Sequence, residues 1–321
     1  MSAFLLTPAT KQTIWGGKRL KRDFNTESGY DSVAEAWSLS CHPDGESVVA
    51  SGEYKGEKLS SVINKLGRKC LGAHCENIED FPILIKLIDA ADKLSVQVHP
   101  DDEYAKAHEK ETHGKTEAWY IIDCDEGAEL IYGFKENITK EQFENSIKDS
   151  TLLDYVNRVK VKPGDVALIE AGTLHAIGAG ILLAEVQQSC NTTYRVYDYN
   201  RPGLDGKPRQ LHIKQSIDVT KCEKPSRSLN PEGEKKIFDG YSSRLLCSCK
   251  FFNMTDIEVT KSYTDNADEA SFVSLLILDG NGELVSSGEK LKITKGSSVF
   301  VPAGDGEFTV NGNVKILLTR V

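Results

Sequence analysis

Side chains that bind metal ions occur in three short motifs of this sequence. They are Q-V-H at residues 97–99, K-T-E at 115–117 and T-L-H at 173–175. Two neutral imidazoles and one carboxylate form a common ligand set for catalytic zinc, which leaves a coordination position for water or substrate. The amide oxygen of Gln97 would be an unusual additional ligand. Together these side chains could form the ligand set of a borderline divalent ion.

These residues do not form a local motif, so the fold must bring them together. Gln97 and His99 are two apart in the strand-like run S-V-Q-V-H-P, and side chains two apart in a strand point to the same face. Eighteen positions then separate His99 from Glu117, and 58 separate Glu117 from His175. Each residue alone also has an ordinary interpretation. A single His in a β protein is often a hydrogen-bonded core or surface residue, and Glu117 would suit the solvent-facing side of a strand.

Short β-like runs dominate the chain and would supply the strands that position these ligands. Gly, Pro, Asp or Asn separates most of the runs, which indicates a sandwich or closed barrel rather than a doubly wound sheet. No nucleotide-binding G-x-G-x-x-G or P-loop motif occurs. The clearest runs are residues 47–50, 83–87, 94–98, 118–122, 166–169, 181–186, 272–278 and 299–301.

Two segments carry helix signals, and a third is typical of a linker. Either aspartate at residues 101–102 can cap a helix that begins DDEYAKAHEK. Thr139 and Gln142 have the spacing of a capping box for a helix over residues 138–159. Residues 223–235 are polar and contain two prolines and a glycine, which predicts a linker at a domain boundary.

A faint internal repeat relates two parts of the chain. Residues 162–175 and 294–307 align at a constant offset of 132. At this offset the two segments share a glycine, an alanine and a second glycine. Two copies of one β-module are the simplest interpretation. At this offset Glu307 replaces His175, and no Q-V-H-like segment precedes the second copy. We therefore expect the second module to be structural and to have no metal site.

The composition argues against several classes of function. The 321 residues carry a formal net charge of −9, whereas general nucleic-acid binding needs a basic face. No apolar run approaches the ~18 residues of a membrane span, and the first residues lack the features of a signal peptide. Eight scattered cysteines without a C-x-x-C motif are typical of reduced thiols, so we expect a cytoplasmic protein.

The motifs, in this order, resemble those of a known enzyme family. Q-x-H-P, K-x-E and P-G-D…A-G-x-x-H are similar to the ligand motifs of metal-dependent cupins, which hold an ion inside a small β-barrel. LSVQVHPDD, GKTEAWYIIDC, AGTLHAIGAG and TTYRVYDYNR more closely resemble type I mannose-6-phosphate isomerases in their short bacterial form. TIWGG and AEAWSLSCHP fit the same family, and these motifs span about residues 14 to 215.

The resemblance implies a metal site, a catalytic residue and a substrate. It implies one zinc ion per chain, held by Gln97, His99, Glu117 and His175. Arg195 would be the active-site arginine and the catalytic residue. The implied activity is the interconversion of mannose 6-phosphate and fructose 6-phosphate. The large helical insertion of longer members is missing here, so the sequence does not determine whether a lid covers the site.

Aldose–ketose isomerisation suits such a site chemically. Removal of a proton alpha to the sugar carbonyl creates an enediolate, whose negative charge a divalent ion can stabilise as a Lewis acid. Arg195 would bind an enediolate oxygen or the phosphate, unless it forms a surface salt bridge with Asp198 or a nearby acid. The resemblance implies that three further residues contact the substrate, including its phosphate. They are Lys86, Ser95 and Lys115. Alternatively, Lys86 would lie at the end of a strand and extend its ammonium group into solvent.

The sequence does not identify the general base, and it leaves other functions open. Glu185, Gln187 and Asp198 would pair with sugar hydroxyls or lie on strand surfaces. Two histidines and one glutamate also satisfy the ligand triad of an iron-dependent oxygenase, which is one alternative. A cupin that binds a sugar or a metal without catalysis is the other. The native metal, the strictness for one sugar phosphate and the oligomeric state are not determined either.

The family resemblance also implies an architecture. We expect a mainly β protein of two cupin-like β-barrel or jelly-roll modules with a small helical segment. The catalytic domain, with short helical insertions, would cover residues 1–222. Residues 223–235 would be the linker, and residues 236–321 the second, non-catalytic β-domain. The expected partner is a small sugar phosphate, with no nucleic acid and no membrane.

Overall fold

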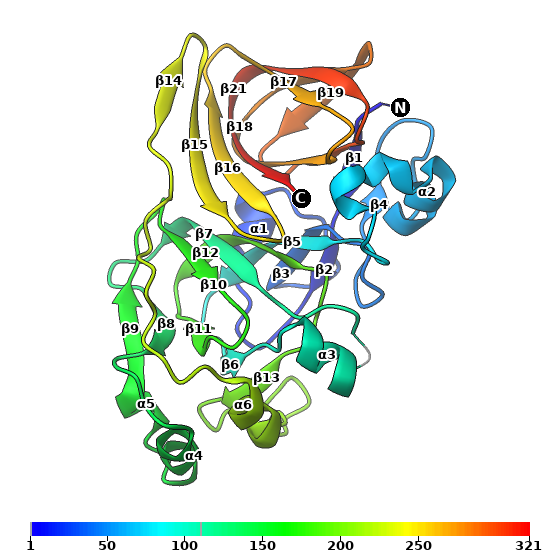
Figure 1. The fold of residues 1–321 in the computed structure, drawn as a ribbon. Coiled ribbons are helices and arrows are strands. Elements are labelled where there is room, and N and C mark those ends of the chain that lie inside the picture. Colours follow the sequence, from blue (N-terminus) through cyan, green and yellow to red (C-terminus); the bar gives the residue numbers. More distant parts are fainter. Residues whose placement is uncertain (1, 110) are drawn as a thin grey trace.

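β-strands are the main secondary structure of the chain, and they lie in three sheets. The computed structural model describes residues 2–109 and 111–321. Figure 1 shows the C-terminal strands, coloured yellow to red, gathered in one body beside the blue-to-green strands of the N-terminal part. The prediction of a mainly β protein is confirmed, and each β-like run singled out in the sequence contains a strand.

Two antiparallel sheets of the N-terminal part enclose a common core. The six-stranded sheet has the order β10-β7-β12-β5-β3-β2, and the five-stranded sheet has the order β13-β6-β11-β8-β9. Trp119 and Leu183 from the first sheet pack with Leu130 and Ile177 from the second in one buried cluster. The inner faces of the two sheets therefore face each other, as in a β-sandwich.

The strands of these two sheets are short. The six-stranded sheet contains β2 (Ala9–Lys11), β3 (Glu35–Leu39), β5 (Ile83–Ala90), β7 (Glu117–Cys124), β10 (Val166–Ile169) and β12 (Ile181–Gln188). The five-stranded sheet contains β6 (Val96–Val98), β8 (Glu129–Phe134), β9 (Val156–Lys160), β11 (His175–Ile177) and β13 (Tyr194–Tyr197).

A third sheet of ten strands forms the other body, and two N-terminal strands belong to it. β1 pairs with β20, and β4 pairs with β1. The strands are β1 (Phe4–Thr7), β4 (Val48–Val49), β14 (Lys236–Phe238), β15 (Tyr241–Ser248), β16 (Asn253–Val259), β17 (Ser262–Ala267), β18 (Val273–Ser286), β19 (Glu289–Thr294), β20 (Ser298–Val301) and β21 (Gly306–Arg320). The domain division at residues 223–235 stays a prediction, and the strand exchange ties the two bodies together.

The internal repeat is confirmed by strand positions and backbone angles. β10 and β20 differ in position by the offset of 132 found in the sequence, and each pairs with a preceding long strand, β7 or β18. Gly164 and Gly296 have φ angles of 92° and 90°, and Gly172 and Gly304 have 86° and 74°. A positive φ favours glycine, so the same turns require it in both copies.

The helices are short and lie between strands. They are α1 (Arg19–Asp23), α2 (Leu59–Leu66), the 3₁₀ helices η1 (Arg68–Leu71) and η2 (Ala73–Cys75), α3 (Asp102–His108), α4 (Lys140–Lys148), α5 (Leu152–Tyr155) and α6 (Ile213–Val219). Asp101 caps α3 by accepting from the backbone N–H of Tyr104. Lys110, the last residue of that expected segment, lies outside the described residues. Within the described ranges, no helix is long and apolar enough to cross a membrane.

The helix expected over residues 138–159 is only partly correct. The capping box of Thr139 and Gln142 is present and begins α4. Ser150 then has a φ of 59°, which the right-handed helix does not allow, and the chain restarts as α5. The remainder forms β9, because Val156–Lys160 pairs with β8. A tertiary pairing thus overrides the helical pattern.

Candidate metal centre

The strand register places two candidate ligands and Arg195 in one row. In the five-stranded sheet, Gln97 of β6 lies directly opposite both Arg195 of β13 and His175 of β11. His175 in turn lies opposite Tyr132 of β8. Residues directly opposite each other on neighbouring strands point to the same face of a sheet. Polar side chains from four strands therefore gather on one face.

The six-stranded sheet presents a second polar set. Glu117 of β7 lies opposite Gln187 of β12. Two positions along, Trp119 lies opposite Glu185, which lies opposite Lys86 of β5. All five side chains are buried. Charged groups are costly to bury without partners, so core packing alone does not explain this face, and it is a candidate binding site.

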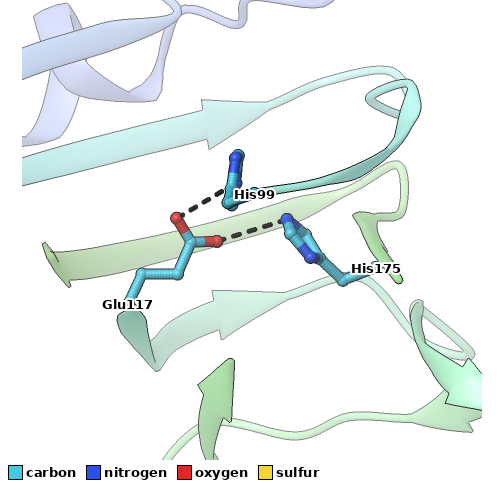
Figure 2. A group of neighbouring side chains, drawn as sticks. All are labelled: His99, Glu117 and His175. Atoms are coloured by element: carbon cyan, nitrogen blue, oxygen red, sulfur yellow. Dashed lines mark ion pairs between the residues drawn. The ribbon is translucent and has the colours of Figure 1, made fainter. Parts of the chain in front are cut away.

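Three of the four predicted metal ligands meet between these strands. The ligand atoms of His99, Glu117 and His175 all lie within 4.8 Å of one another. Nε2 of His99 is 3.5 Å from Oε2 of Glu117, and Nε2 of His175 is 3.4 Å from Oε1 of Glu117. Dashed lines in Figure 2 mark these two pairs. Each residue is at most 1% exposed. In the described part of the chain, no other group of three or more His, Cys, Asp or Glu could hold a metal ion.

Backbone carbonyls fix the protonation of both histidines. Nδ1 of His99 lies 2.9 Å from the carbonyl oxygen of Thr192, and Nδ1 of His175 lies 2.8 Å from that of Thr173. A carbonyl oxygen only accepts, so each Nδ1 carries the proton and each Nε2 keeps its lone pair. Burial lowers the pKa of His175 to about 4 and lowers the pKa of His99 well below its usual value. Both rings are therefore neutral acceptors at neutral pH.

The Glu117 carboxylate is a third acceptor beside the two imidazole nitrogens, and one of its oxygens has no hydrogen-bond donor within the described part of the chain. Its Oε1 is buried, and no hydrogen-bond donor in the described residues satisfies it. Burial, followed by the negative charge of Glu185, raises the pKa of Glu117 above its usual value. Two imidazole lone pairs and a carboxylate that converge in this way are a ligand set that divalent cations bind. These residues therefore fit a divalent metal ion.

Lys115 brings a positive charge to the same atoms. Its Nζ lies 2.8 Å from Oε2 of Glu117 and 3.2 Å from Nε2 of His99. Burial disfavours the charged amine, but Glu117 and Glu185 outweigh it and raise the pKa of Lys115 above its usual value. Lys115 thus stays cationic beside the ligand cluster, where an anionic substrate group would meet it.

Gln97, Ser95 and Arg195 lie together beside the cluster. The amide nitrogen of Gln97 is 3.3 Å from Nε2 of His175 and donates to it. Its amide oxygen would have to turn inward to bind a metal ion. Nε of Arg195 is 3.3 Å from the hydroxyl oxygen of Ser95, and a terminal nitrogen donates to the carbonyl of Gln210 at 2.9 Å. The structure thus brings these predicted residues to one edge of the polar face.

Asp198 does not pair with Arg195. Its carboxylate accepts hydrogen bonds from Arg209 at 2.6 and 2.7 Å and from Arg201 at 3.2 Å. Burial opposes the charge of this carboxylate, but the two guanidinium groups lower the pKa of Asp198. The alternative of an Arg195–Asp198 salt bridge is therefore wrong, and Asp198 holds the neighbouring loop instead.

Lys86 is buried and paired rather than extended to solvent. Its Nζ lies 2.9 Å from Oε1 of Glu185 and 3.7 Å from Oε2 of Glu35. The indole N–H of Trp119 donates to the other Glu185 oxygen at 2.9 Å. Burial opposes ionisation, yet Lys86 and Lys115 outweigh it and lower the pKa of Glu185. Glu185 and Lys86 thus form a buried ion pair on the polar face.

Sequence reasoning missed several contributors to this site. The backbone carbonyls of Thr173 and Thr192 orient the two histidines, and no side-chain type signals such a role. The indole of Trp119 donates a hydrogen bond to Glu185, and the sequence contained a signal for this contact. Trp119 lies two residues after Glu117, so strand alternation places both on the same face.

The second module offers no comparable cluster in its described residues. Glu307, at the position equivalent to His175, is exposed, whereas His175 is fully buried. The core between the strands of this module is apolar and includes Ile257, Val273 and Phe308. An apolar core offers no ligands to an ion, and the structural role of this module stays a prediction.

Comparisons with known proteins agree on one family. The model of the phosphomannose isomerase type I catalytic domain matches residues 3–143, and that of the mannose-6-phosphate isomerase cupin domain matches residues 243–321. The chain is 38% identical to the mannose-6-phosphate isomerase ManA of Bacillus subtilis, over 98% of this chain and 97% of the relative. It is also 38% identical to the mannose-6-phosphate isomerase of Streptococcus mutans, over 96% of this chain and 94% of the relative.

Solved structures give the same result for the fold. The crystal structure of the mannose 6-phosphate isomerase from Bacillus subtilis matches with a TM-score of 0.90 and 32% identity, and covers 100% of both chains. A putative mannosephosphate isomerase from Archaeoglobus fulgidus matches with a TM-score of 0.75 and 23% identity, over 99% of this chain and 96% of that chain. The second match shows the fold alone. The expected cupin-like architecture is confirmed.

Proposed function

Because the chain belongs to the type I phosphomannose isomerase family, we propose that it interconverts mannose 6-phosphate and fructose 6-phosphate at a metal ion held by His99, Glu117 and His175. One observation carries this placement of the site. Two unprotonated imidazole nitrogens and a carboxylate, all buried, converge within 4.8 Å. A catalytic site of this chemistry needs such ligands on rigid strands.

The proposed ion is one zinc per chain, with the amide oxygen of Gln97 as a fourth ligand. Two histidines and one carboxylate suit zinc, and Gln97 lies beside His175 in the same row. When bound, a divalent ion supplies Lewis-acid stabilisation of the negative charge on the enediolate oxygens. The protein part of the site holds the ligands in place, because each histidine is tied to a backbone carbonyl.

Lys115 and Arg195 are the cations that face the substrate in this proposal. Lys115 is buried beside Glu117 and remains charged. Arg195 lies in the row of Gln97, and its Nε reaches Ser95. A guanidinium presents a planar fork that suits a phosphate or two enediolate oxygens. Arg195 therefore stabilises charge that develops during proton transfer, and Ser95 orients it and contacts the phosphate end of the sugar.

Lys86 contributes in a different way from Lys115. Its charge is balanced by Glu185 at 2.9 Å, so the pair as a whole is neutral. A neutral pair attracts a phosphate dianion weakly, but both members can hydrogen-bond neutral sugar hydroxyls. We therefore assign Lys86 to hydroxyl recognition and leave the phosphate to Ser95, Lys115 and Arg195.

The other functions considered from the sequence are not favoured. An iron-dependent oxygenase could use the same three ligands, but the family models and the full-length relatives are isomerases. A non-catalytic cupin would not require the charged Lys115 and Arg195 beside the ligands. We also propose a cytoplasmic location, which the eight free cysteines support because reducing compartments keep thiols unpaired.

A coupled assay with metal analysis tests this proposal. Purified protein should convert mannose 6-phosphate to fructose 6-phosphate, measured through phosphoglucose isomerase and glucose-6-phosphate dehydrogenase. The same sample should contain one zinc ion per chain by elemental analysis. Two ions per chain would contradict the structural role of the second module. Activity that persists after chelation has removed all metal would contradict the Lewis-acid role.

A further inference from the structure

The side-chain amide of Gln187 is fully buried, and within the described part of the chain only its nitrogen forms hydrogen bonds. Gln187 is 0% exposed and lies one residue before the end of β12, opposite Glu117 in the strand register. Its amide nitrogen donates to the carbonyl oxygens of Gln188 at 2.8 Å and Cys190 at 2.5 Å. Two acceptors fix the orientation of the amide, because only its nitrogen can donate. Its oxygen has no hydrogen-bond partner among the described residues.

These two hydrogen bonds close the turn that leads to a histidine partner. The backbone N–H of Cys190 donates to the carbonyl of Gln188 at 2.7 Å, so that carbonyl accepts twice. The N–H of Thr192 then reaches Sγ of Cys190 at 3.4 Å. The carbonyl of Thr192 accepts from Nδ1 of His99 at 2.9 Å. A chain of contacts therefore runs from Gln187 through the turn to a proposed metal ligand.

The position of the Thr192 carbonyl decides where His99 points its free nitrogen. Nδ1 donates its proton to this carbonyl, and Nε2 then faces Glu117 and the Lys115 ammonium. Residues 189–191 form no helix or strand, so few ladder hydrogen bonds hold this turn in place. A side-chain amide that bonds two of its carbonyls restricts the conformations of the turn.

We propose that Gln187 is a positioning residue of the metal site. Its amide group fixes the turn at residues 188–192, so that the Thr192 carbonyl holds His99 in the orientation and tautomer needed to bind an ion. This inference rests on the proposed function, since it assumes that His99 is a ligand. Loss of partners that orient a metal-bound histidine typically weakens metal affinity about 10- to 100-fold.

The substitution Gln187→Met tests the role, because methionine has a similar length and neither donates nor accepts an amide hydrogen bond. The measurements are the zinc dissociation constant by chelator competition and the visible absorption spectrum of the cobalt-substituted protein. We expect an affinity roughly 10-fold weaker than that of the wild type and a changed cobalt spectrum. Gln187→Leu should give the same result and serves if the methionine variant does not fold.

Ser271→Ala is a matched control. Ser271 is a buried residue of the second module whose hydroxyl donates to the carbonyl of Phe272, the next residue, at 2.7 Å. Its loss should lower the thermal midpoint of the metal-free protein and leave zinc affinity and the cobalt spectrum unchanged. A Gln187 variant that lowers only the thermal midpoint, as this control does, would overturn the inference.

The result separates the inference from the proposed function. If the wild type binds zinc and Gln187→Met binds it equally with the same cobalt spectrum, the positioning role is wrong and the metal site stands. If KM rises in that variant with unchanged zinc affinity, the unpartnered amide oxygen contacts substrate instead, which also overturns the positioning role. If the wild type itself binds no zinc, the proposed function fails.

Discussion

Gln97 and His175 lie directly opposite each other on β6 and β11, and the Gln97 amide nitrogen is 3.3 Å from Nε2 of His175. This pairing joins two motifs that are far apart in the sequence. Arg195 pairs with Gln97 from the neighbouring strand β13, so its side chain lies on the same face as His175. The candidate ligands and the candidate catalytic arginine are therefore positioned by the same short ladder.

His175→Ala should remove metal and activity together. His175 supplies one of three converging ligand atoms and lies fully inside the protein. Elemental analysis of the purified variant should show no bound zinc, and the coupled assay should show no turnover. The second module should still fold, because its apolar core does not include this residue. Full activity in a metal-free variant would contradict the proposed role of the ion.

Arg195→Ala should act mainly on kcat. If Arg195 stabilises charge that develops as the proton leaves the sugar, its loss should lower kcat by about 10² or more, on the scale of one preorganised donor. Zinc content should stay normal. Arg195→Lys should recover little, because lysine lacks the planar fork. Steady-state kinetics that give a normal kcat with raised KM would instead assign Arg195 to phosphate binding.

Glu307→Gln should leave turnover nearly unchanged. Glu307 occupies the position equivalent to His175 but is exposed, and it lies on β21 in the structural module. The coupled assay should give kcat and KM within twofold of the wild type, and the thermal midpoint should move little, as is usual for surface substitutions. A large fall in kcat of a folded variant would show that the second module takes part in catalysis.

Lys86→Met should destabilise the protein by about 3–5 kcal/mol, because it leaves the buried Glu185 charge without its partner. Chemical denaturation measures the free energy of unfolding. Lys65→Met is the control, since Lys65 pairs with Glu57 at the surface and should cost less than about 1 kcal/mol.

The Lys86→Met deficit should also depend on pH. In the wild type Lys86 contributes to lowering the pKa of Glu185, whereas burial alone would raise it. Without Lys86, the folded-state pKa of Glu185 moves upward, towards or above its unfolded value. Protonation of Glu185 then costs the folded variant less than it costs the folded wild type, so the stability deficit should shrink as pH falls from neutral through that pKa. A deficit that grows on acidification would show that Glu185 is not the uncompensated charge.

The sequence by itself determined the local features. Alternation put Gln97 and His99 on one side of a strand, and Thr139 with Gln142 marked the start of α4. The offset of 132 identified β10 and β20 as equivalent strands. Each of these rests on residues close in sequence or on repeated spacing, where local backbone preference decides the structure.

Only the tertiary structure decided how the site is assembled. His99, Glu117 and His175 come from separate strands or strand ends, and the register between strands brings their atoms within 4.8 Å. The orientation of both histidines depends on backbone carbonyls, which every residue possesses and no sequence pattern reveals. The burial of Lys86 against Glu185 likewise needed the pairing of β5 with β12. Long-range pairing sets distances and burial, and these control which groups are charged and which atoms remain free to bind a metal ion.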